Sequence, residues 1–518
     1  MMRFGLIAGL YVLLAASGVA QAAKPERQRK ASAADLGGVS PMDYGCAGDG
    51  LTDDTLCFGK ALAASYGRSL MLGPHAYLIR PPSVGYSPAR PVQIVGLGAS
   101  YAGEPASSII VATANATLFT LHSNSSIRGV FIDMTNGGKL ANTSGAAITM
   151  AASVSGVALD HLWIHGACNG VALNGSINWL QYSRIDGFTG GGCVGVSIGL
   201  ATTMGLSVDD HILKNEIDGA GSSGPCLEIL DAGGLFLTQN SMQFCPTGTL
   251  VEPGVNQHVE WLTSSGNYLG DTVVNQALAI NTKDPSSVVR GVQSDEDWSA
   301  SNSAQAPLVV IENMGRGTVA GIKFSSFRAM GANGDAIDVN FGVTDFQLNS
   351  STICGFNGYG VNFAKGVSSA QIIGGKTSLT CDDVAGFISG TYGVNLAGSN
   401  SAITIANTDL TGVPTPIAGT PTGNSVVVNN LGVDGGQPNV SSASTINLNA
   451  VFPTWTISGA ATVSTINGFW NGRLVRLIPN SPGLSFITGG NLCNALTSAL
   501  NVPIEALYSS TSGCWYLK

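Results

Sequence analysis

The sequence repeats itself at intervals of about 25 residues, and this repeat limits the possible folds more than any other feature. Four strand-like segments, 177–187, 209–219, 234–244 and 258–269, can be superposed with successive offsets of 32, 25 and 25 residues. A second group of short runs continues the pattern from 322 to 412. Short strands joined by Gly and Asn turns, without an intervening helix, are typical of a solenoid coil, whereas a propeller blade needs ~40 residues. The repeat therefore predicts an all-β fold, a right-handed parallel β-helix.

The composition agrees with a chain of short strands and tight turns. Charged residues make up 11% of the chain, well below the usual ~25%, which argues against a coiled coil. The 69 glycines follow no three-residue period, so the chain is not collagen-like. With a net charge of −9 the chain has no basic stripe that could neutralise phosphates, and we expect no nucleic-acid partner.

In a solenoid the equivalent residues of successive coils form rows, about 4.8 Å apart from coil to coil. The superposition predicts one row of rings and one row of small polar side chains: Trp179, His211, Phe236 and Trp261, and Ser183, Asn215, Asn240 and Ser265. We expect the polar row to be an inward ladder of hydrogen-bonded side chains at a turn. Further along the chain, Asp335 aligns with Tyr359 and Asp338 aligns with Asn362, and we expect both acids to belong to turns.

The chain divides into four parts. Residues 1–22 have the pattern of a signal peptide, with Arg3, an apolar run and Ala20-Gln21-Ala22, although a retained anchor helix is the alternative. Residues 23–38 form a polar, basic lead-in that we expect to be mobile, and residues 39–430 form the β-helix. A linker and a C-terminal β-rich cap or assembly domain fill residues 431–518. The predicted location is secreted or periplasmic, with no membrane span in the mature chain.

The C-terminal part reads as antiparallel strands, and we expect it to cap the rod or to assemble it, for example into a homotrimer. The alternative is a carbohydrate-binding module that uses Trp455, Trp470 or Trp515.

Ten cysteines, an even number, agree with export to an oxidising compartment. No C-x-x-C or H-E-x-x-H motif is present, so we expect no zinc site. Residues in a solenoid contact only their own coil and its neighbours, which favours pairing in sequence order. The predicted disulfides are Cys46–Cys57, Cys168–Cys193, Cys226–Cys245, Cys354–Cys381 and Cys493–Cys514.

The start of the predicted β-helix carries a recognisable pattern. It consists of Asp43-Tyr44-Gly45, Gly48-Asp49-Gly50 and Thr52-Asp53-Asp54, followed by Phe58 and Ala61-Leu62 of an expected helix. This segment, 39–79, resembles the entry segment of the pectate-lyase superfamily of β-helices, which includes tailspike-like polysaccharide depolymerases and relatives of the polygalacturonases. The resemblance implies a parallel β-helix and an extracellular polysaccharide as the partner. We expect Thr52 or Asp53 to cap the helix, with a metal site at Asp49, Asp53 and Asp54 as the alternative.

The catalytic motifs of these relatives are not present in their order. Asp209-Asp210 occurs, but His165-Gly166 and Arg184-Ile185 precede it, and the only Asn-Thr-Asp, at 407–409, follows it. The resemblance therefore implies the fold and not the reaction.

The densest polar cluster of the repeats is the candidate site. The superposition pairs Tyr182 with Lys214, Arg184 with Glu216 and Asp186 with Asp218, and it places Asp210 just upstream on the same coil. Asp186 with Asp218, or Asp210 with Glu216, could supply the two carboxyls that glycoside hydrolysis needs at ~5–9.5 Å. The predicted ring row, Trp179, His211, Phe236 and Trp261, would stack sugar rings beside them.

Two other interpretations of this cluster remain open. In a uronate lyase, Arg184 or a Ca²⁺ ion would neutralise the substrate carboxylate, and Lys214, His211 or Tyr182 would remove the proton; no other cofactor is expected. In a non-catalytic surface, adhesion or structural protein, Arg184 and Glu216 are a surface ion pair and the rings are structural.

Overall fold

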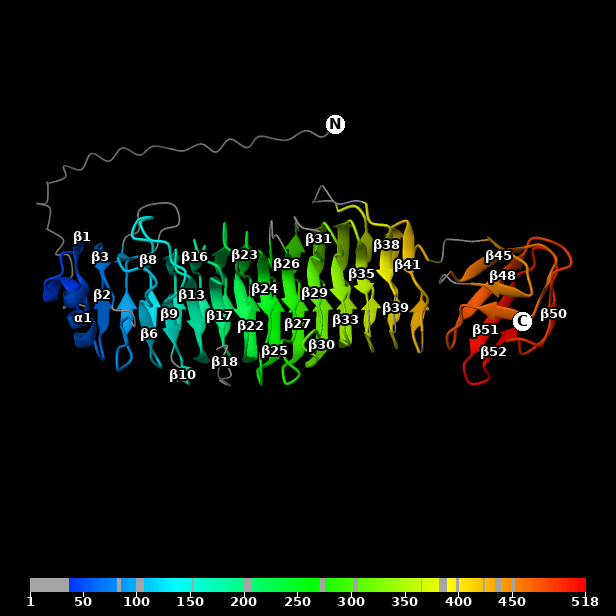
Figure 1. Cartoon of the computed structure of the whole chain (residues 1–518), viewed down its shortest axis with the longest axis horizontal. Coiled ribbons are helices and arrows are strands. Elements are labelled where there is room, and N and C mark those ends of the chain that lie inside the picture. The colour runs from blue at the N-terminus through cyan, green and yellow to red at the C-terminus, as the bar shows by residue number, and fades with distance from the viewer. Residues whose placement is uncertain are drawn as a thin grey trace, which may run out of the picture.

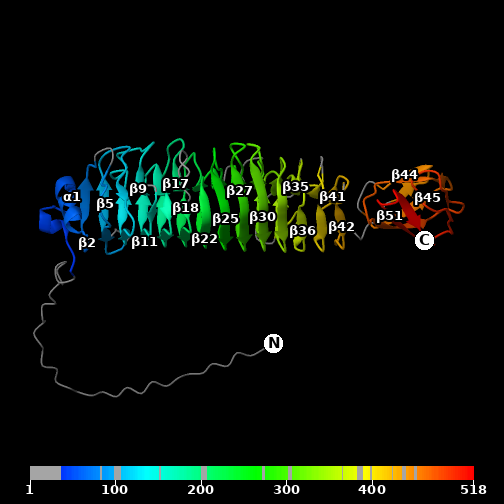
Figure 2. The same ribbon diagram turned by 90° about the horizontal axis from the view of Figure 1, so that it is seen from below.

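The computed structural model describes residues 37–518 except 82–84, 99–106, 151–152, 200–206, 271–274, 301–305, 365, 382–388, 397–399, 423, 434–438 and 449–451. The predicted signal peptide, 1–22, and nearly all of the predicted lead-in, 23–38, lie outside the described residues. Three faces of parallel strands stack along the long axis of the molecule, and the C-terminal residues lie at one end of the stack (Figures 1 and 2). This arrangement is a parallel β-helix, as the repeat predicted.

The first face, sheet A, has 17 strands. They are β2 (Ser69–Met71), β4 (Gln93–Val95), β7 (Ser126–Arg128), β10 (Val154–Ser155), β11 (Ala158–Asp160), β14 (Gly175–Ser176), β15 (Trp179–Gln181), β18 (Ser207–Val208), β19 (His211–Leu213), β22 (Ala232–Thr238), β25 (His258–Ser265), β27 (Val288–Asp295), β30 (Thr318–Ser325), β33 (Thr344–Asn349), β36 (Gln371–Ile373), β39 (Thr404–Ala406) and β42 (Val426–Val428).

The second face, sheet B, consists of an eight-stranded and a five-stranded part. The first part contains β1 (Asp49–Asp53), β3 (Ala76–Ile79), β5 (Ser108–Val111), β8 (Phe131–Asp133), β12 (Trp163–His165), β16 (Arg184–Asp186), β20 (Glu216–Asp218) and β23 (Ser241–Gln243). The second part contains β28 (Trp298–Ala300), β31 (Arg328–Ala332), β34 (Thr352–Phe356), β37 (Lys376–Ser378) and β40 (Asp409–Gly412).

The third face, sheet C, has 12 strands. They are β6 (Phe119–Leu121), β9 (Ala146–Met150), β13 (Asn169–Leu173), β17 (Val194–Ile198), β21 (Leu227–Ile229), β24 (Thr247–Val251), β26 (Gln276–Ile280), β29 (Val309–Ile311), β32 (Ile337–Val339), β35 (Tyr359–Phe363), β38 (Tyr392–Asn395) and β41 (Thr415–Ala418).

Aliphatic rows fill the interior because alternate residues of a strand point inward. One row on sheet B runs through Ile132, Ile164, Ile185, Ile217 and Met242, all of them buried. Burial of a side chain of this size contributes roughly 1.5–3 kcal/mol. The rows therefore stabilise the stack and fix its register, since a shift by one residue would turn each row outward.

The predicted polar ladder exists at the corner between sheets A and B, but its fourth member is Asn267 and not Ser265. The side chain of each member accepts a hydrogen bond from the backbone N–H of the member before it, through Asn215, Asn240, Asn267 and Asp297. Ser265 pairs with Thr238 at the end of β25, two residues before the ladder position. The offset between β22 and β25 is 27 residues, whereas the superposition assumed 25.

All five predicted disulfides are confirmed: Cys46–Cys57, Cys168–Cys193, Cys226–Cys245, Cys354–Cys381 and Cys493–Cys514. No helix in the described ranges is long and apolar enough to cross a membrane.

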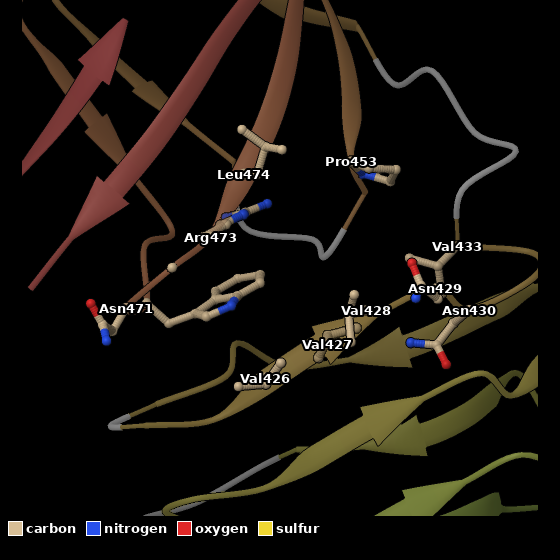
Figure 3. Close-up of a pocket in the computed structure, with 12 residues that line it drawn as sticks. Val426, Val427, Val428, Asn429, Asn430, Val433, Pro453, Asn471, Arg473 and Leu474 are labelled. Atoms are coloured by element: carbon tan, nitrogen blue, oxygen red, sulfur yellow. The ribbon is translucent and has the colours of Figure 1, made fainter.

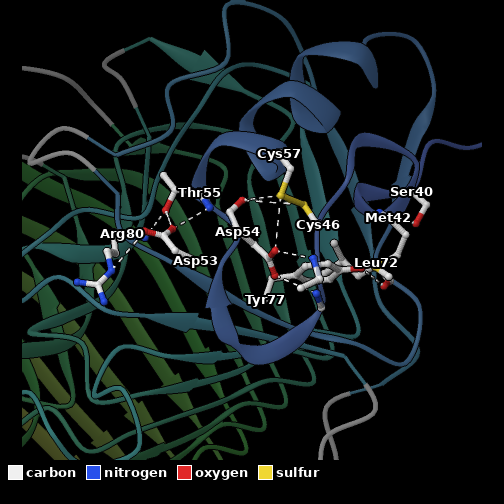
Figure 4. Close-up of a disulfide and its surroundings, with 12 residues drawn as sticks. Ser40, Met42, Cys46, Asp53, Asp54, Thr55, Cys57, Leu72, Tyr77 and Arg80 are labelled. Atoms are coloured by element: carbon white, nitrogen blue, oxygen red, sulfur yellow. Dashed lines mark hydrogen bonds and ion pairs between the residues drawn. A yellow bond between two sulfur atoms is a disulfide. The ribbon is translucent and has the colours of Figure 1, made fainter.

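A short helix, α1 (Thr55–Ala64), lies at the N-terminal end of the stack, next to the 3₁₀ turn η2 (Pro41–Tyr44) (Figure 1). Its N-cap is Asp54, so the predicted caps Thr52 and Asp53 are wrong. The Asp54 carboxylate instead accepts hydrogen bonds from the N–H groups of Ala47 and Gly48 beside the first disulfide (Figure 4). Asp53 accepts hydrogen bonds from Thr55, so these acids fix the loop that precedes α1.

The C-terminal unit, residues 439–518, has its own hydrophobic core. Its main sheet contains β43 (Asn439–Ser441), β45 (Thr454–Ser458), β48 (Leu474–Pro479), β51 (Ile504–Ser509) and β52 (Cys514–Leu517), and its shorter strands are β44 (Thr445–Asn447), β46 (Thr462–Val463), β47 (Thr465–Asn467), β49 (Ser485–Phe486) and β50 (Leu496–Thr497). The expectation of antiparallel strands is wrong in part, because β43, β45 and β48 pair in parallel while β48, β51 and β52 are antiparallel.

The three tryptophans considered for sugar binding in this unit are all buried. Trp455 and Trp515 belong to the core of the C-terminal unit, and Trp470 packs against the core of the β-helix. None of them presents an open ring face to a sugar. Arg473 and Leu474 of this unit lie opposite Val426, Val427 and Val428 of the last sheet A strand (Figure 3).

Candidate functional site

The predicted cluster lies on the outer face of sheet B, across β12, β16 and β20. The register pairs Arg184 with Glu216 and Asp186 with Asp218, which confirms this part of the superposition. The preceding strand adds Trp163 opposite Arg184 and His165 opposite Asp186. Residues in one row share a face, so these side chains form a single surface.

Asp186 is the centre of a saturated hydrogen-bond network. Its carboxylate lies 2.6 Å from His165 Nδ1, 2.6 Å from Arg184 Nε and 3.2 Å from Trp163 Nε1. Burial opposes ionisation, but the hydrogen bonds from His165 and Arg184 outweigh it and lower the pKa of Asp186. The hydrogen bond to Asp186 in turn raises the pKa of His165. Asp186 therefore remains ionised and is a poor proton donor.

Arg184 joins the remaining acids of the cluster. Its guanidinium nitrogens lie 3.3 Å from Glu216 Oε1 and 3.6 Å from Asp218 Oδ2. Three carboxylates thus converge on one cation, which leaves Arg184 badly placed to neutralise a substrate uronate. The same contacts disfavour the proposed Ca²⁺, because the oxygens that would hold the ion face the guanidinium.

A shallow pocket of about 290 Å³ opens at the corner beside this cluster. His161, Tyr182 and Lys214 occupy equivalent corner positions with positive φ on three successive coils. The His161 and Tyr182 rings stack at 5.1 Å, and Lys214 Nζ lies 5.5 Å from the Tyr182 ring centroid. The predicted proximity of Tyr182 and Lys214 is confirmed, and both line the pocket together with Arg184.

The ring row on sheet A is real for three of its four predicted members. The rings of Trp179 and His211 stack at 3.8 Å and those of His211 and Phe236 at 4.8 Å, on the outer face. Burial lowers the pKa of His211, which keeps its ring neutral in the stack. Trp261 is not in the row, because Phe236 pairs with Thr263. Trp261 instead lies two residues earlier within β25, at a bend where its φ is 56°.

Asp210 does not reach this surface. It is fully buried, and its carboxylate accepts hydrogen bonds from the Asn178 N–H and the Ser207 hydroxyl inside the coil. Burial raises its pKa to about 6. A polysaccharide outside the helix cannot contact it, so the pairing of Asp210 with Glu216 as catalytic carboxyls is wrong.

Sequence reasoning missed Trp163 and His165, although a signal for them was available. The run 162–166 lies 21 residues before 183–187 and carries an inward Ile164 where the later run carries Ile185. Extending the superposition by one coil would have found both residues.

A second group of acids lies on sheet C and was not predicted as a site. Asp335 precedes β32 as expected of a turn residue, but Asp338 lies within β32 and faces outward beside Asn362. The expectation that Asp338 belongs to a turn is therefore wrong. Alternation in a three-residue strand is too short to indicate from sequence which residue faces out.

The two aspartates have different environments. Asp335 accepts hydrogen bonds from the Tyr359 N–H at 2.8 Å and the Asn362 amide at 2.9 Å, and these bonds oppose the rise in pKa that its burial causes. Asp338 Oδ1 is buried and has no hydrogen-bond partner among the described residues. Burial, with the nearby charges of Asp335 and Glu312, raises the pKa of Asp338 to about 7. Its carboxyl is therefore poised to exchange a proton near neutral pH.

Aromatic and amide side chains adjoin these acids. The rings of Tyr359 and Tyr392 lie 5.3 Å apart on neighbouring coils, directly after Asp335 in the same row. Asn362 and Asn395 continue the row of Asp338 and are joined by a 2.7 Å hydrogen bond. Rings beside hydrogen-bonding amides form a surface that suits sugars.

Comparison with known proteins supports the fold. No known protein family and no curated protein matches the chain. Among solved structures, it is similar to tailspike protein 3 of bacteriophage CBA120, with a TM-score of 0.52, 12% identity and coverage of 93% of this chain and 69% of that one. It is also similar to the A-module of the Azotobacter vinelandii mannuronan C-5 epimerase AlgE4, with a TM-score of 0.52, 14% identity and coverage of 75% and 99%.

Proposed function

We propose that this protein is a secreted β-helix that binds and hydrolyses an extracellular polysaccharide, with its catalytic carboxyls on sheet C. The observation that carries the proposal is the outward Asp338 carboxyl, whose buried Oδ1 has no partner among the described residues and whose pKa is raised to about 7. Asp338 would act as the general acid. The second carboxylate would come from Asp335 or Glu312, which flank it.

The balance of charge on this face favours hydrolysis over elimination. Glu252, Glu312, Asp335 and Asp338 are all acidic, and the nearby Lys283 is held by Glu252 at 2.7 Å. A lyase must bind and neutralise a uronate carboxylate, which these acids would repel. Hydrolysis needs two carboxyls in different environments, and Asp335 and Asp338 meet that requirement.

Two further observations support an extracellular polysaccharide as the partner. Five disulfides suit an oxidising compartment. One of the similar folds is that of a mannuronan epimerase, which acts on a polysaccharide.

The sheet B cluster is the second candidate location for the proposed active site. Glu216 and Asp218 lie two residues apart on one strand and one face, which separates their Cα atoms by about 6.6 Å. Two carboxyls on one face of a strand could serve as the pair that glycoside hydrolysis needs. Their shared contact with Arg184 argues against it, because both carboxylates already face the guanidinium instead of a substrate.

The test compares Asp338→Asn with Asp218→Asn on a panel of neutral and uronate-containing polysaccharides. New reducing ends indicate hydrolysis, and ultraviolet absorbance of an unsaturated product indicates elimination. We expect reducing ends alone, and a loss of ~10²-fold or more in Asp338→Asn but not in Asp218→Asn. Asp335→Asn and Glu312→Gln then identify the second carboxyl.

The opposite result, with activity lost only in Asp218→Asn, would move the site to sheet B. Neither signal across the panel would instead support a non-catalytic surface or adhesion protein.

A further inference from the structure

A trough of about 440 Å³ crosses the outer face of sheet C near its N-terminal end. Its floor is the row Thr149, Ala172 and Ser197, and Glu228, the next residue of the row, closes one end of the trough. The floor residues are small, so a ligand can approach the backbone of three adjacent strands. The volume lies within the range of ~300–1,000 Å³ that small-molecule sites occupy.

One wall of the trough contains a buried acceptor without a partner. Asn174 is 6% exposed, and its Nδ2 donates to the Met150 carbonyl at 3.1 Å. Its Oδ1 is buried and accepts no hydrogen bond from any described residue. Turning the amide over would place Oδ1 against the Met150 carbonyl, so the acceptor is fixed in place. An unpaired buried acceptor of this kind costs ~1–3 kcal/mol, which a ligand donor would recover.

The charges of the trough indicate what kind of donor it takes. Its described lining residues include one charged side chain, Glu228, and no Lys, Arg or His. Thr149 and Ser197 add hydroxyls that both donate and accept. An anionic ligand would meet Glu228 without a compensating cation among the described lining residues, whereas a ligand hydroxyl can donate to Asn174 Oδ1 and to the Glu228 carboxylate.

We propose that this trough binds neutral hexose units of a polysaccharide, through hydroxyl donors to Asn174 and Glu228. The trough does not depend on the proposed catalytic acids. Glu228 and Asp338 belong to one row but are separated by four strand steps, or about 19 Å. A chain lying along sheet C could contact both, and binding here needs no catalysis.

The experiment is titration calorimetry of the full chain with linear hexamers of glucose and mannose, and with a hexagalacturonate as the anionic comparison. We expect at least one neutral hexamer to bind and the hexagalacturonate to bind at least tenfold more weakly. Ser197→Trp fills the trough and should weaken binding of the neutral hexamer by at least tenfold. Thr344→Trp, an exposed position on sheet A away from the ring row, is the matched control and should leave binding unchanged.

Asn174→Leu provides an independent variant if Ser197→Trp fails to fold, and we expect it to weaken binding by about five- to tenfold. Asp338→Asn should bind the hexamer as the unmodified chain does, even if it has lost all hydrolysis. The inference is overturned if no neutral hexamer binds at millimolar concentration, if hexagalacturonate binds as tightly, or if Ser197→Trp or Asn174→Leu folds and binds normally.

Discussion

Asp186 and Asp338 both lie on outer faces of the β-helix, yet their surroundings shift their pKa values in opposite directions. Asp186 is held by His165, Arg184 and Trp163, and its pKa is lowered. Asp338 faces other acids, and its pKa is raised. The difference follows from the partners and not from the residue type, so each site can be tested by removing one charge.

Replacing Asp186 by Asn should lower the pKa of His165, because the hydrogen bond to Asp186 is the main cause of its rise. In the unmodified protein the protonated His165 stabilises the fold below pH ~6.5, and this stabilisation is lost as the pH rises through the folded-state pKa. Titration of the His165 ring protons by NMR measures the shift directly. An unchanged His165 pKa in Asp186→Asn would show that the network does not form.

Asp338 should make stability fall as the pH rises. Its pKa is about 7 when folded and ordinarily 3.8, so between these values the folded chain holds a proton that the unfolded chain releases. Asp338→Asn removes this dependence. Its free energy of unfolding, compared with that of the unmodified chain, should therefore be higher at pH 8 than at pH 4 by on the order of 1 to 3 kcal/mol. Denaturant unfolding at both pH values measures it, with the exposed Asp345→Asn as the control. Equal pH profiles for the two variants would contradict the shift.

For individual residues, the sequence predicted which side chains lie next to each other better than it predicted their burial or pKa. One offset was enough to predict the pairing of Arg184 with Glu216, because each of them directly follows a residue of the polar ladder. The burial of Asp210 could not be predicted in this way. Asp209 and Asp210 are adjacent and point to opposite sides of the coil, and the sequence does not indicate which of the two faces inward. The raised pKa of Asp338 depends on Glu312 of the preceding coil as well as on burial and on Asp335, and no single repeat contains that information.

At the scale of elements, the polar ladder stabilises the corner between sheets A and B. Asn240 accepts from the Asn215 N–H and donates to the Ile212 carbonyl, and both of those groups are buried. Asn240→Ala leaves them unpaired and should cost about 2–4 kcal/mol. Gln239→Ala, at the neighbouring exposed corner position, is the control. Denaturant unfolding measures both, and an equal small loss in the two variants would mean that the ladder contributes little.

The ladder also explains one error at the element level. Trp261 resembles the ring residues of the earlier segments, yet it takes the positive-φ bend within sheet A that Asp209 and Gly234 occupy on other coils. A tryptophan with positive φ is unusual, so the sequence gives no reason to expect Trp261 at this bend. The superposition therefore aligned Trp261 with the other rings and placed the segment two residues out of register. The correct register depends on the buried ladder residue, Asn267, and not on the exposed ring.

For the whole molecule, the period predicted the β-helix because each coil must bury the same rows against its neighbours. No repeat was predicted for the C-terminal unit, and its mixed sheet pairs strands in both directions. Such pairings depend on contacts that are distant in sequence, so they could not be read from strand patterns alone.

The last coil needs a cover, since an open sheet edge pairs readily with other chains. Trp470 of the C-terminal unit packs against the core of the β-helix, and the Arg473 guanidinium lies 4.3 Å from its ring centroid. Val426 and Val428 of β42 line the pocket between the two parts (Figure 3). We therefore propose that residues 431–518 cap or assemble the rod and do not catalyse.

Truncation after Asn430 should expose this edge and either lower the melting temperature by several degrees or change the oligomeric mass, including any homotrimer. Trp470→Ala should act in the same direction but less strongly, because it removes one buried ring and keeps the rest of the unit. Tyr516→Ser, at an exposed position, is the matched control. Light scattering and thermal unfolding measure both effects. A truncated chain that kept its mass and stability would show that the C-terminal unit is not a cap. If that chain had also lost all hydrolysis, the active site would lie in the C-terminal unit.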